Sequence, residues 1–176
     1  MNLHLIPIKT SRKKPKTGDV FLVQPIKGVY YYGKVISEKS NSKYELIKDF
    51  PLIYIYNQTT TNFELPNFLS NILIAPLITN YSPWTRGYFY TIGNIPVTDE
   101  EKNLDCGFKD FPITDFNNEC PFFRNIHGER IDYKPQFNTS FGLCSYKGVN
   151  FEICKILGID DWFLNALFSF LIDTRG

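Results

Sequence analysis

The stretch GDVFLVQPIKGVYYYGKVI, residues 18–36, decides the fold class of this chain. Residues 19–24 and 29–36 are rich in Val, Phe, Tyr and Ile, which suit the pleated, half-buried surface of a strand. The residues between them, PIKG, are typical of a turn because they include Pro and Gly. The sequence therefore predicts a β-hairpin that begins just after Gly18.

The second strand of this hairpin carries three consecutive tyrosines. Side chains alternate between the two faces of a strand, so Tyr30 and Tyr32 are expected on one face and Tyr31 on the other. Gly33 interrupts the strand, which is typical of a bulge or of a close approach to the backbone.

Further strands are expected after the hairpin. Residues 52–56, LIYIY, are apolar at both sets of alternating positions, which indicates a strand covered on both faces. Residues 65–71 predict a short helix, and residues 93–125 predict a long loop-rich region because Gly and Pro recur there without periodicity. The other expected strands are 44–48, 72–75 and 88–92, with weaker strand signals over 141–154.

The end of the chain predicts a helix over residues 160–173. Asp160 is suited to cap its first turn. Apolar residues recur at helical spacing and extend around most of the cylinder, so this helix is expected to be buried on most sides. The predicted fold class is mainly β (α+β): an antiparallel sheet or a partly open SH3-like barrel, covered by a C-terminal helix.

Charge divides the chain into a basic N-terminal segment and a mildly acidic body. Residues 1–16 hold five of the 19 Lys and Arg residues and no Asp or Glu, which leaves 14 basic against 18 acidic side chains in residues 17–176. We expect residues 1–16 to form a flexible tail and residues 17–176 a single β-rich domain. The acidic body disfavours nucleic acid as a partner, because phosphate binding needs clustered cations, and it suits a basic protein.

The sequence holds no recognisable catalytic or metal-binding pattern. The phosphate-binding, nucleophile-elbow and zinc-protease motifs are absent. His127 is the only histidine beyond residue 16, and the stretch NIHGE around it predicts an exposed turn. We therefore expect a protein that is not an enzyme and that needs no cofactor or metal. The four cysteines lack C-x-x-C spacing and are expected to be reduced and mostly buried: Cys106, Cys120, Cys144 and Cys154.

The sequence also shows no secretory signal or membrane span. The segment 3–8 is apolar but short, and its basic residues follow it instead of preceding it. Apolar runs fall short of the ~18–20 residues that cross a bilayer. A cytoplasmic protein without membrane contact is expected.

Several motifs together resemble one known family. Gly18-Asp19-Val20, followed by the aromatic-Gly-basic-Val-Ile pattern of residues 32–36, resembles the opening of the immunity protein 26 family. The segment LIAP at residues 73–76, then Trp84, then GYFYTIGNIP at residues 87–96, resembles the middle of that family. The resemblance covers about residues 15–115. It implies a bacterial cytoplasmic protein of a polymorphic toxin system that binds a cognate toxin domain and blocks it, with no catalytic motif to carry over.

Four residues are local candidates for contact with a protein partner. Trp84 and Arg86 lie in a loop, and both residue types are favoured at interface hot spots. A core anchor is an equally good interpretation of Trp84. Tyr30 and Tyr32 share a strand face, and ordinary packing within the sheet is the favoured interpretation of both.

Two other functions stay open. The hairpin also resembles the start of the SH3-like barrel in MazF-type endoribonuclease toxins, but over the first two strands only, and the polar loop 37–42 follows where those enzymes need catalytic residues. The second alternative is an adaptor whose residues 9–16 contact nucleic acid or anionic lipid, against the simpler interpretation of a solubilising tail. The oligomeric state is not determined by the sequence.

Overall fold

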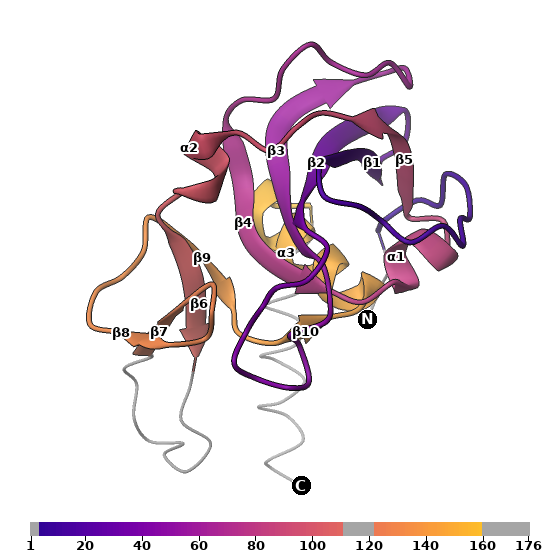
Figure 1. Ribbon diagram of the computed structural model, residues 1–176. Helices are drawn as coiled ribbons and strands as arrows, with labels where there is room; N and C mark the ends of the chain where they lie inside the picture. The colour runs from indigo at the N-terminus through magenta and orange to yellow at the C-terminus, as the bar shows by residue number, and fades with distance from the viewer. Residues whose placement is uncertain (1–3, 111–121, 160–176) are drawn as a thin grey trace, which may run out of the picture.

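The computed structural model describes residues 4–110 and 122–159. Within these ranges the chain forms a larger six-stranded sheet, a smaller four-stranded sheet and three helices (Figure 1). The larger sheet contains, in spatial order, β10 (Leu143–Cys144), β4 (Ile72–Thr79), β3 (Leu52–Thr60), β2 (Val29–Ser37), β1 (Asp19–Ile26) and β5 (Phe89–Asn94). The smaller sheet contains β8 (Arg130–Ile131), β7 (Phe122–Asn125), β6 (Cys106–Asp110) and β9 (Phe137–Ser140). The helices are α1 (Ser82–Thr85), α2 (Asp99–Lys102) and α3 (Tyr146–Leu157).

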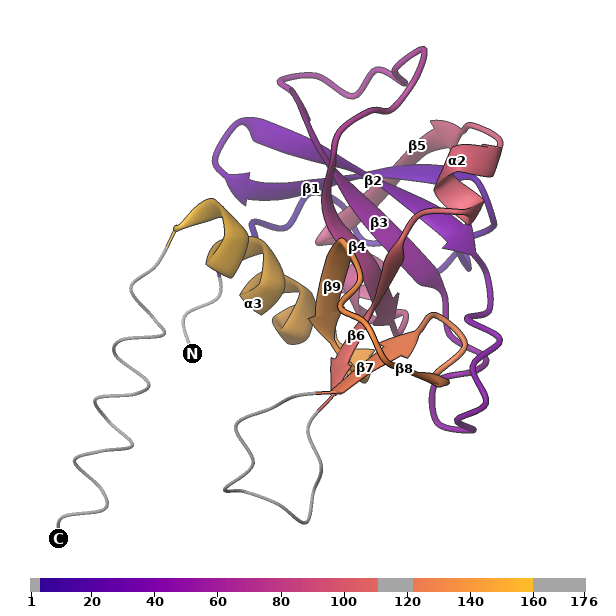
Figure 2. The same ribbon diagram turned by 90° about the vertical axis from the view of Figure 1, so that its left-hand side faces the viewer.

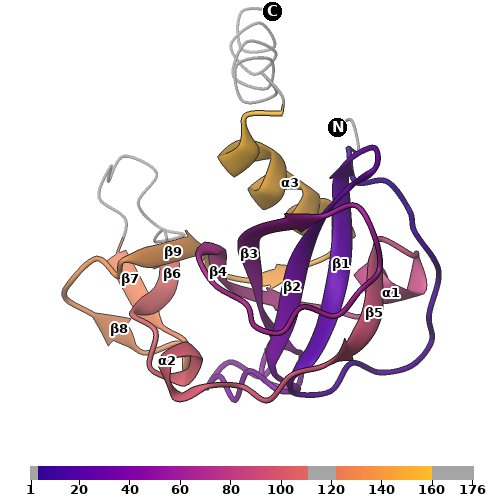
Figure 3. The same ribbon diagram turned by 90° about the horizontal axis from the view of Figure 1, so that it is seen from above.

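The predicted mainly β fold is confirmed, with the larger sheet curled into a half-barrel. Neighbouring strands of this sheet pair antiparallel, except for the short parallel pair β10 and β4. The smaller sheet lies to one side of the half-barrel (Figure 3). It combines antiparallel pairs with a parallel pair, β6 and β9.

The predicted hairpin is formed by β1 and β2, and the role of Gly33 is confirmed. The register between β2 and β3 shifts next to Gly33, so a bulge is present. A Cβ atom on Gly33 would lie 2.3 Å from the ring of Phe21. Glycine at this position therefore lets an aromatic ring pack directly onto the backbone of the neighbouring strand.

Both faces of the larger sheet are covered, as the apolar pattern of residues 52–56 predicts. Ile53 and Ile55 face a core that also holds Val149 and Ile153 of α3. On the opposite face, Leu52, Tyr54 and Tyr56 pack with Cys106 and Phe108 of the smaller sheet. The apolar alternation on both faces is thus explained by a helix on one side and a second sheet on the other.

A helix covers the larger sheet, and in the described residues that helix is α3. It packs against β4 and β1, and it begins at the cap Ser145 and ends at Gly158, which has left-handed backbone angles (Figure 2). The weak strand signals over 141–154 are therefore wrong beyond β10. The helix predicted over residues 160–173 lies outside the described residues.

Two other predicted elements are wrong. Residues 44–48 form a turn instead of a strand, because the hydroxyl of Ser40 donates to the backbone oxygen of Ile47 (2.7 Å) and closes the turn locally. Residues 65–71 form no helix. Pro66 disfavours helical angles at the residue before it, and Leu65 and Leu69 reach back onto the sheet instead.

The N-terminal segment lies along the half-barrel. Leu5 is buried, and the Ile6 N–H donates to the backbone oxygen of Gln24 (2.8 Å). Asn150 of α3 accepts hydrogen bonds from the backbone of residues 4 and 5. These contacts attach residues 4–8 to the body, and the division of the chain at residue 16 stays a prediction. Within residues 4–110 and 122–159, the helices are too short or too polar to cross a bilayer.

Candidate partner-binding site

A buried ion pair joins α2 to the larger sheet. The Nζ atom of Lys34 lies 2.7 Å from Oε2 and 3.0 Å from Oε1 of Glu101, and the two side chains are 1% and 9% exposed. Lys34 also donates to the backbone oxygen of Pro96 at 2.9 Å. The hydroxyl of Tyr56 donates to Glu101 Oε1. Among the described residues every buried side-chain nitrogen and oxygen atom has a hydrogen-bond partner, so this network is closed and fixes the scaffold.

The local sequence explains how Glu101 reaches the sheet. Thr98 and Glu101 form a capping box: Thr98 Oγ1 accepts from the Glu101 N–H (3.2 Å), and Glu101 Oε2 accepts from the Thr98 N–H (2.8 Å). This box sets the start of α2 and turns the Glu101 carboxylate toward Lys34.

The thiol beside this network is not activated. Cys106 Sγ lies 3.2 Å from the hydroxyl of Tyr54, and burial raises the pKa of Cys106 to about 11. Burial likewise raises the pKa of Cys144 to about 12. Because the thiolate is the nucleophilic form, both thiols are poor nucleophiles near neutral pH. Within the described parts of the chain, no cluster of His, Cys, Asp and Glu is suited to hold a metal ion.

An aromatic surface lies over the β1–β2–β5 side of the half-barrel. The ring of Phe63, from the β3–β4 loop, lies 5.1 Å from Tyr30 and 5.5 Å from Tyr90. Two apolar side chains of the same loop, Leu65 and Phe68, are also exposed, Phe68 to 68%. We call these five residues the aromatic face.

The loop that carries the aromatic face is held by packing on the sheet. A Cβ atom at Gly93 of β5 would lie 2.8 Å from Leu65 Cδ2, so the glycine makes room for this leucine. The hydroxyl of Tyr32 donates to the backbone oxygen of Glu64 at 3.2 Å. Tyr30 and Tyr32 therefore share a face, as predicted, but Tyr32 is buried beneath the loop and Tyr30 contributes to the surface.

The structure places the other two candidates in different environments. Trp84 is 1% exposed, packs edge-on against Phe21 and Phe89, and donates from Nε1 to Thr91 Oγ1 (3.2 Å). It is thus an anchor of the core, beneath the surface on which Arg86 lies.

Arg86 belongs to a small cluster on the surface of the protein. Its guanidinium carbon lies 4.8 Å from the ring centroid of Tyr146, and this ring stacks on Tyr88 at 5.1 Å. The partner-binding roles of Tyr30, Tyr32, Trp84 and Arg86 stay predictions.

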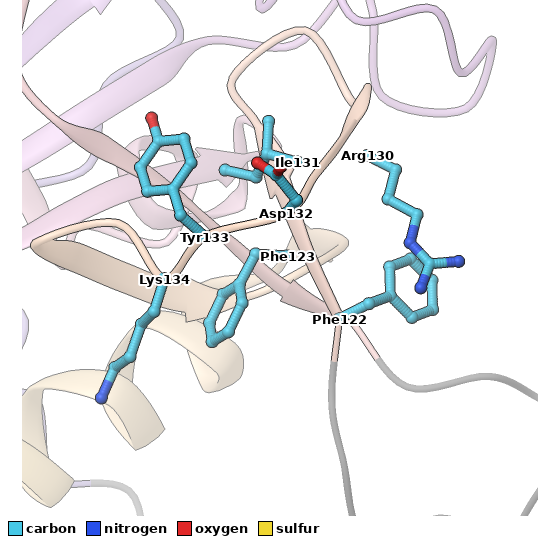
Figure 4. Close-up of a pocket in the computed structure, with 7 residues that line it drawn as sticks. All are labelled: Phe122, Phe123, Arg130, Ile131, Asp132, Tyr133 and Lys134. Carbon is cyan, nitrogen blue, oxygen red and sulfur yellow. The ribbon is translucent and has the colours of Figure 1, made fainter.

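An open groove of about 740 Å3 lies on the smaller sheet (Figure 4). Figure 4 shows Phe122 and Arg130 on one side of it, and Phe123, Tyr133 and Lys134 on the other. The groove is lined by Phe122, Phe123, Arg130, Ile131, Asp132, Tyr133 and Lys134.

Comparison with models of protein families shows which family the chain belongs to. The family model described as immunity protein 26 matches residues 16–115, more than half of the 176 residues. The chain belongs to the immunity protein 26 family. No curated protein and no solved structure matches this family member.

The match to immunity protein 26 covers β1 to β6, and with them the network around Lys34 and the whole aromatic face. The groove of Figure 4 and α3 lie beyond the matched residues. This distribution agrees with the extent of the resemblance seen in the sequence, which ends near residue 115.

Sequence reasoning missed two of these features. The loop-rich region predicted over residues 93–125 gave no sign that Glu101 is buried against Lys34. The capping-box spacing from Thr98 to Glu101 was the available signal. The groove had a weaker signal, the alternation of aromatic and basic residues in FFRN and RIDYK. His127 lies in an exposed turn, as predicted.

Proposed function

We propose that this member of the immunity protein 26 family is a bacterial cytoplasmic protein that binds a cognate toxin domain and neutralises it without catalysis. The observation that carries the proposal is the family match over residues 16–115. Neutralisation by binding requires an exposed surface of suitable chemistry on a rigid scaffold, and does not require a reactive group.

We infer that the aromatic face is the main contact surface for the toxin. Its exposed Phe63, Leu65 and Phe68 are large apolar side chains of one loop, and exposed apolar surface of this kind marks interaction sites. The rings of Tyr30 and Tyr90 both pack against the ring of Phe63, so little conformational freedom is lost when a partner covers them.

The remaining candidates have supporting or separate roles in this proposal. Tyr32 and Trp84 support the surface from below through the loop and the core. Arg86, stacked on Tyr146, is proposed as a second contact because Arg and Tyr are enriched at interfaces.

Co-expression with the toxin domain encoded beside this protein tests the proposal. We expect rescue of growth and a stable complex on co-purification. Phe63→Ser should weaken the complex at least tenfold, because it removes the central ring of the aromatic face. Leu46→Ser is the matched control: Leu46 is 84% exposed and lies in the β2–β3 turn at the opposite end of the sheet (Figure 1), so its loss should leave the affinity unchanged.

The outcomes separate the possible functions. Absence of rescue and of binding with every neighbouring toxin domain would refute the proposal. Cleavage of RNA by the purified protein would replace it with the endoribonuclease alternative. Equal effects of Phe63→Ser and Leu46→Ser would keep the immunity function but remove the aromatic face as its contact surface.

A further inference from the structure

Two arginines share one aromatic ring at the groove on the smaller sheet. The pairing of β7 with β8 places Arg124 directly opposite Arg130. The guanidinium carbons lie 4.7 Å (Arg124) and 4.9 Å (Arg130) from the ring centroid of Phe122. Each guanidinium is therefore held by contact with the same ring, which restricts its orientation.

Among the described residues, only one of these arginines forms an ion pair with a carboxylate. Arg124 donates from Nε to Asp110 Oδ2 at 2.6 Å and from Nη1 to the backbone oxygen of Gly128 at 3.1 Å. Arg130 is exposed and forms no ion pair within residues 4–110 and 122–159. Arg124 thus stacks on the Phe122 ring and donates to a carboxylate at the same time. Arg130, in the same hairpin, stacks on the same ring but has its donors toward solvent.

The rest of the groove favours an anionic and partly apolar ligand. Lys134 adds a second cation to Arg130, against a single acid, Asp132, among the lining residues. Phe123 and Tyr133 provide apolar ring surface on the side of Lys134, and Phe122 provides it beside Arg130. A peptide segment that carries Glu or Asp next to an aromatic residue satisfies both kinds of contact.

We propose that this groove binds an acidic segment of the partner protein. A carboxylate of that segment accepts hydrogen bonds from Arg130, in the way that Asp110 accepts one from Arg124. The inference rests on the proposed function, since the partner is the toxin domain, and adds a contact beyond the family-matched residues. A nucleic-acid phosphate is the less favoured occupant, because two cations among the lining residues are few for phosphate binding.

The first experiment tests the groove without the toxin. The peptide acetyl-Glu-Phe-Glu-Glu-amide is titrated into the full chain, and the side-chain Nε–Hε resonances of the arginines are followed by NMR. We expect a saturable shift for Arg130 and none for Arg12, an exposed arginine in the N-terminal segment. The same peptide with Gln in place of Glu should produce no shift, because it carries no carboxylate.

The second experiment uses the complex with the toxin domain. Arg130→Gln should weaken the complex about tenfold and reduce the dependence of its Kd on salt between 50 and 200 mM, because a charge-assisted contact is lost. Arg130→Lys should recover part of the affinity, since it keeps the charge but not the stacking and the fork of donors. Arg12→Gln, the matched control, should behave as the unaltered protein.

The outcomes distinguish this inference from the proposed function. A toxin complex whose Kd is unchanged by Arg130→Gln, or the absence of a peptide shift at Arg130 up to 10 mM, overturns the inference and leaves the immunity function standing. Absence of any toxin complex, with peptide binding at Arg130 retained, refutes the immunity function and supports the acidic-ligand chemistry of the groove. A shift at Arg130 with poly-uridine RNA that the peptide does not reverse overturns the inference in favour of a phosphate ligand.

Discussion

Replacing Lys34 with Met tests whether the buried ion pair holds α2 on the larger sheet. The substitution keeps most of the apolar length of the side chain and removes the charge that lies 2.7 Å from Glu101. Removing one partner of a buried pair costs about 3–5 kcal/mol, because the other charge is left buried without its counter-ion. Glu101 retains two donors, the Tyr56 hydroxyl and the Thr98 N–H, so we expect the lower end of this range.

The expected loss is large enough for standard measurements. For a chain of this size, 1 kcal/mol shifts the melting temperature by about 2–4 °C, so a loss of about 3 kcal/mol lowers it by about 6–12 °C. Urea unfolding followed by circular dichroism measures the free energy directly, and an unchanged slope shows that the same surface unfolds. Lys39→Met, which breaks the exposed pair with Asp49, is the matched control and should leave the midpoint unchanged.

A double variant makes the reasoning refutable. Lys34→Met combined with Glu101→Leu leaves no buried charge, so most of the stability lost in the single variant should return. A loss below about 1 kcal/mol in Lys34→Met would show that the pair contributes little. A double variant as unstable as the two single losses added together would show that the two side chains are not coupled.

Three further predictions concern the core and the thiols. Gly33→Ala should lower the free energy of unfolding, measured in urea, by about 1–3 kcal/mol because its Cβ meets an aromatic ring. In the control Gly28→Ala nothing lies within 4 Å of the added Cβ, so the variant carries only the strain of its positive φ angle. Equal losses of stability in the two variants would contradict the close approach at Gly33. Trp84→Ala should lower the free energy of unfolding by about 3–5 kcal/mol as a core truncation, whereas Arg86→Ala should change it by no more than about 0.5 kcal/mol. A Trp84→Ala protein as stable as the unaltered protein would refute the anchor role. The pKa of Cys106 rises from about 8.5 in the unfolded chain to about 11 in the folded protein, so the unfolded state alone ionises in this window and stability should fall as the pH increases from 8.5 to 11. Cys106→Ala should reduce this alkaline loss in unfolding curves recorded at pH 7, 9 and 10, and an identical loss in the variant would exclude the thiol as its source.

Parts of this fold are predictable from local patterns alone. The alternation of apolar residues in 19–24, 29–36 and 52–56 predicts strands because successive side chains point to opposite faces. The same alternation places Tyr31 and Tyr32 on different faces and shows that β3 is covered on both sides. Gly33 signals a bulge before any neighbour is known, since glycine weakens a strand unless it has a structural role.

The wrong assignments share a physical cause. Residues 44–48 and 65–71 have side chains compatible with regular structure. In the first segment, the hydrogen bond from Ser40 to the backbone oxygen of Ile47 favours a turn. In the second, packing of Leu65 on the sheet favours an extended chain. Propensity differences are of the order of 1 kcal/mol, and contacts with other parts of the chain exceed them. Local sequence therefore describes the long hairpin better than it describes these short connections.

The sequence by itself thus determined the β-rich class, the hairpin, the doubly covered strand and the family to which the chain belongs. Only the tertiary structure placed Trp84, in α1, inside and Arg86, just after α1, outside, because two positions in a segment predicted as a loop carry no periodic signal of burial. It also assembled the aromatic face from residues 30, 63 and 90, and joined residues 34 and 101 in a buried pair. These contacts depend on how the half-barrel curls and how its loops return to it, which is decided by packing between segments far apart in the chain.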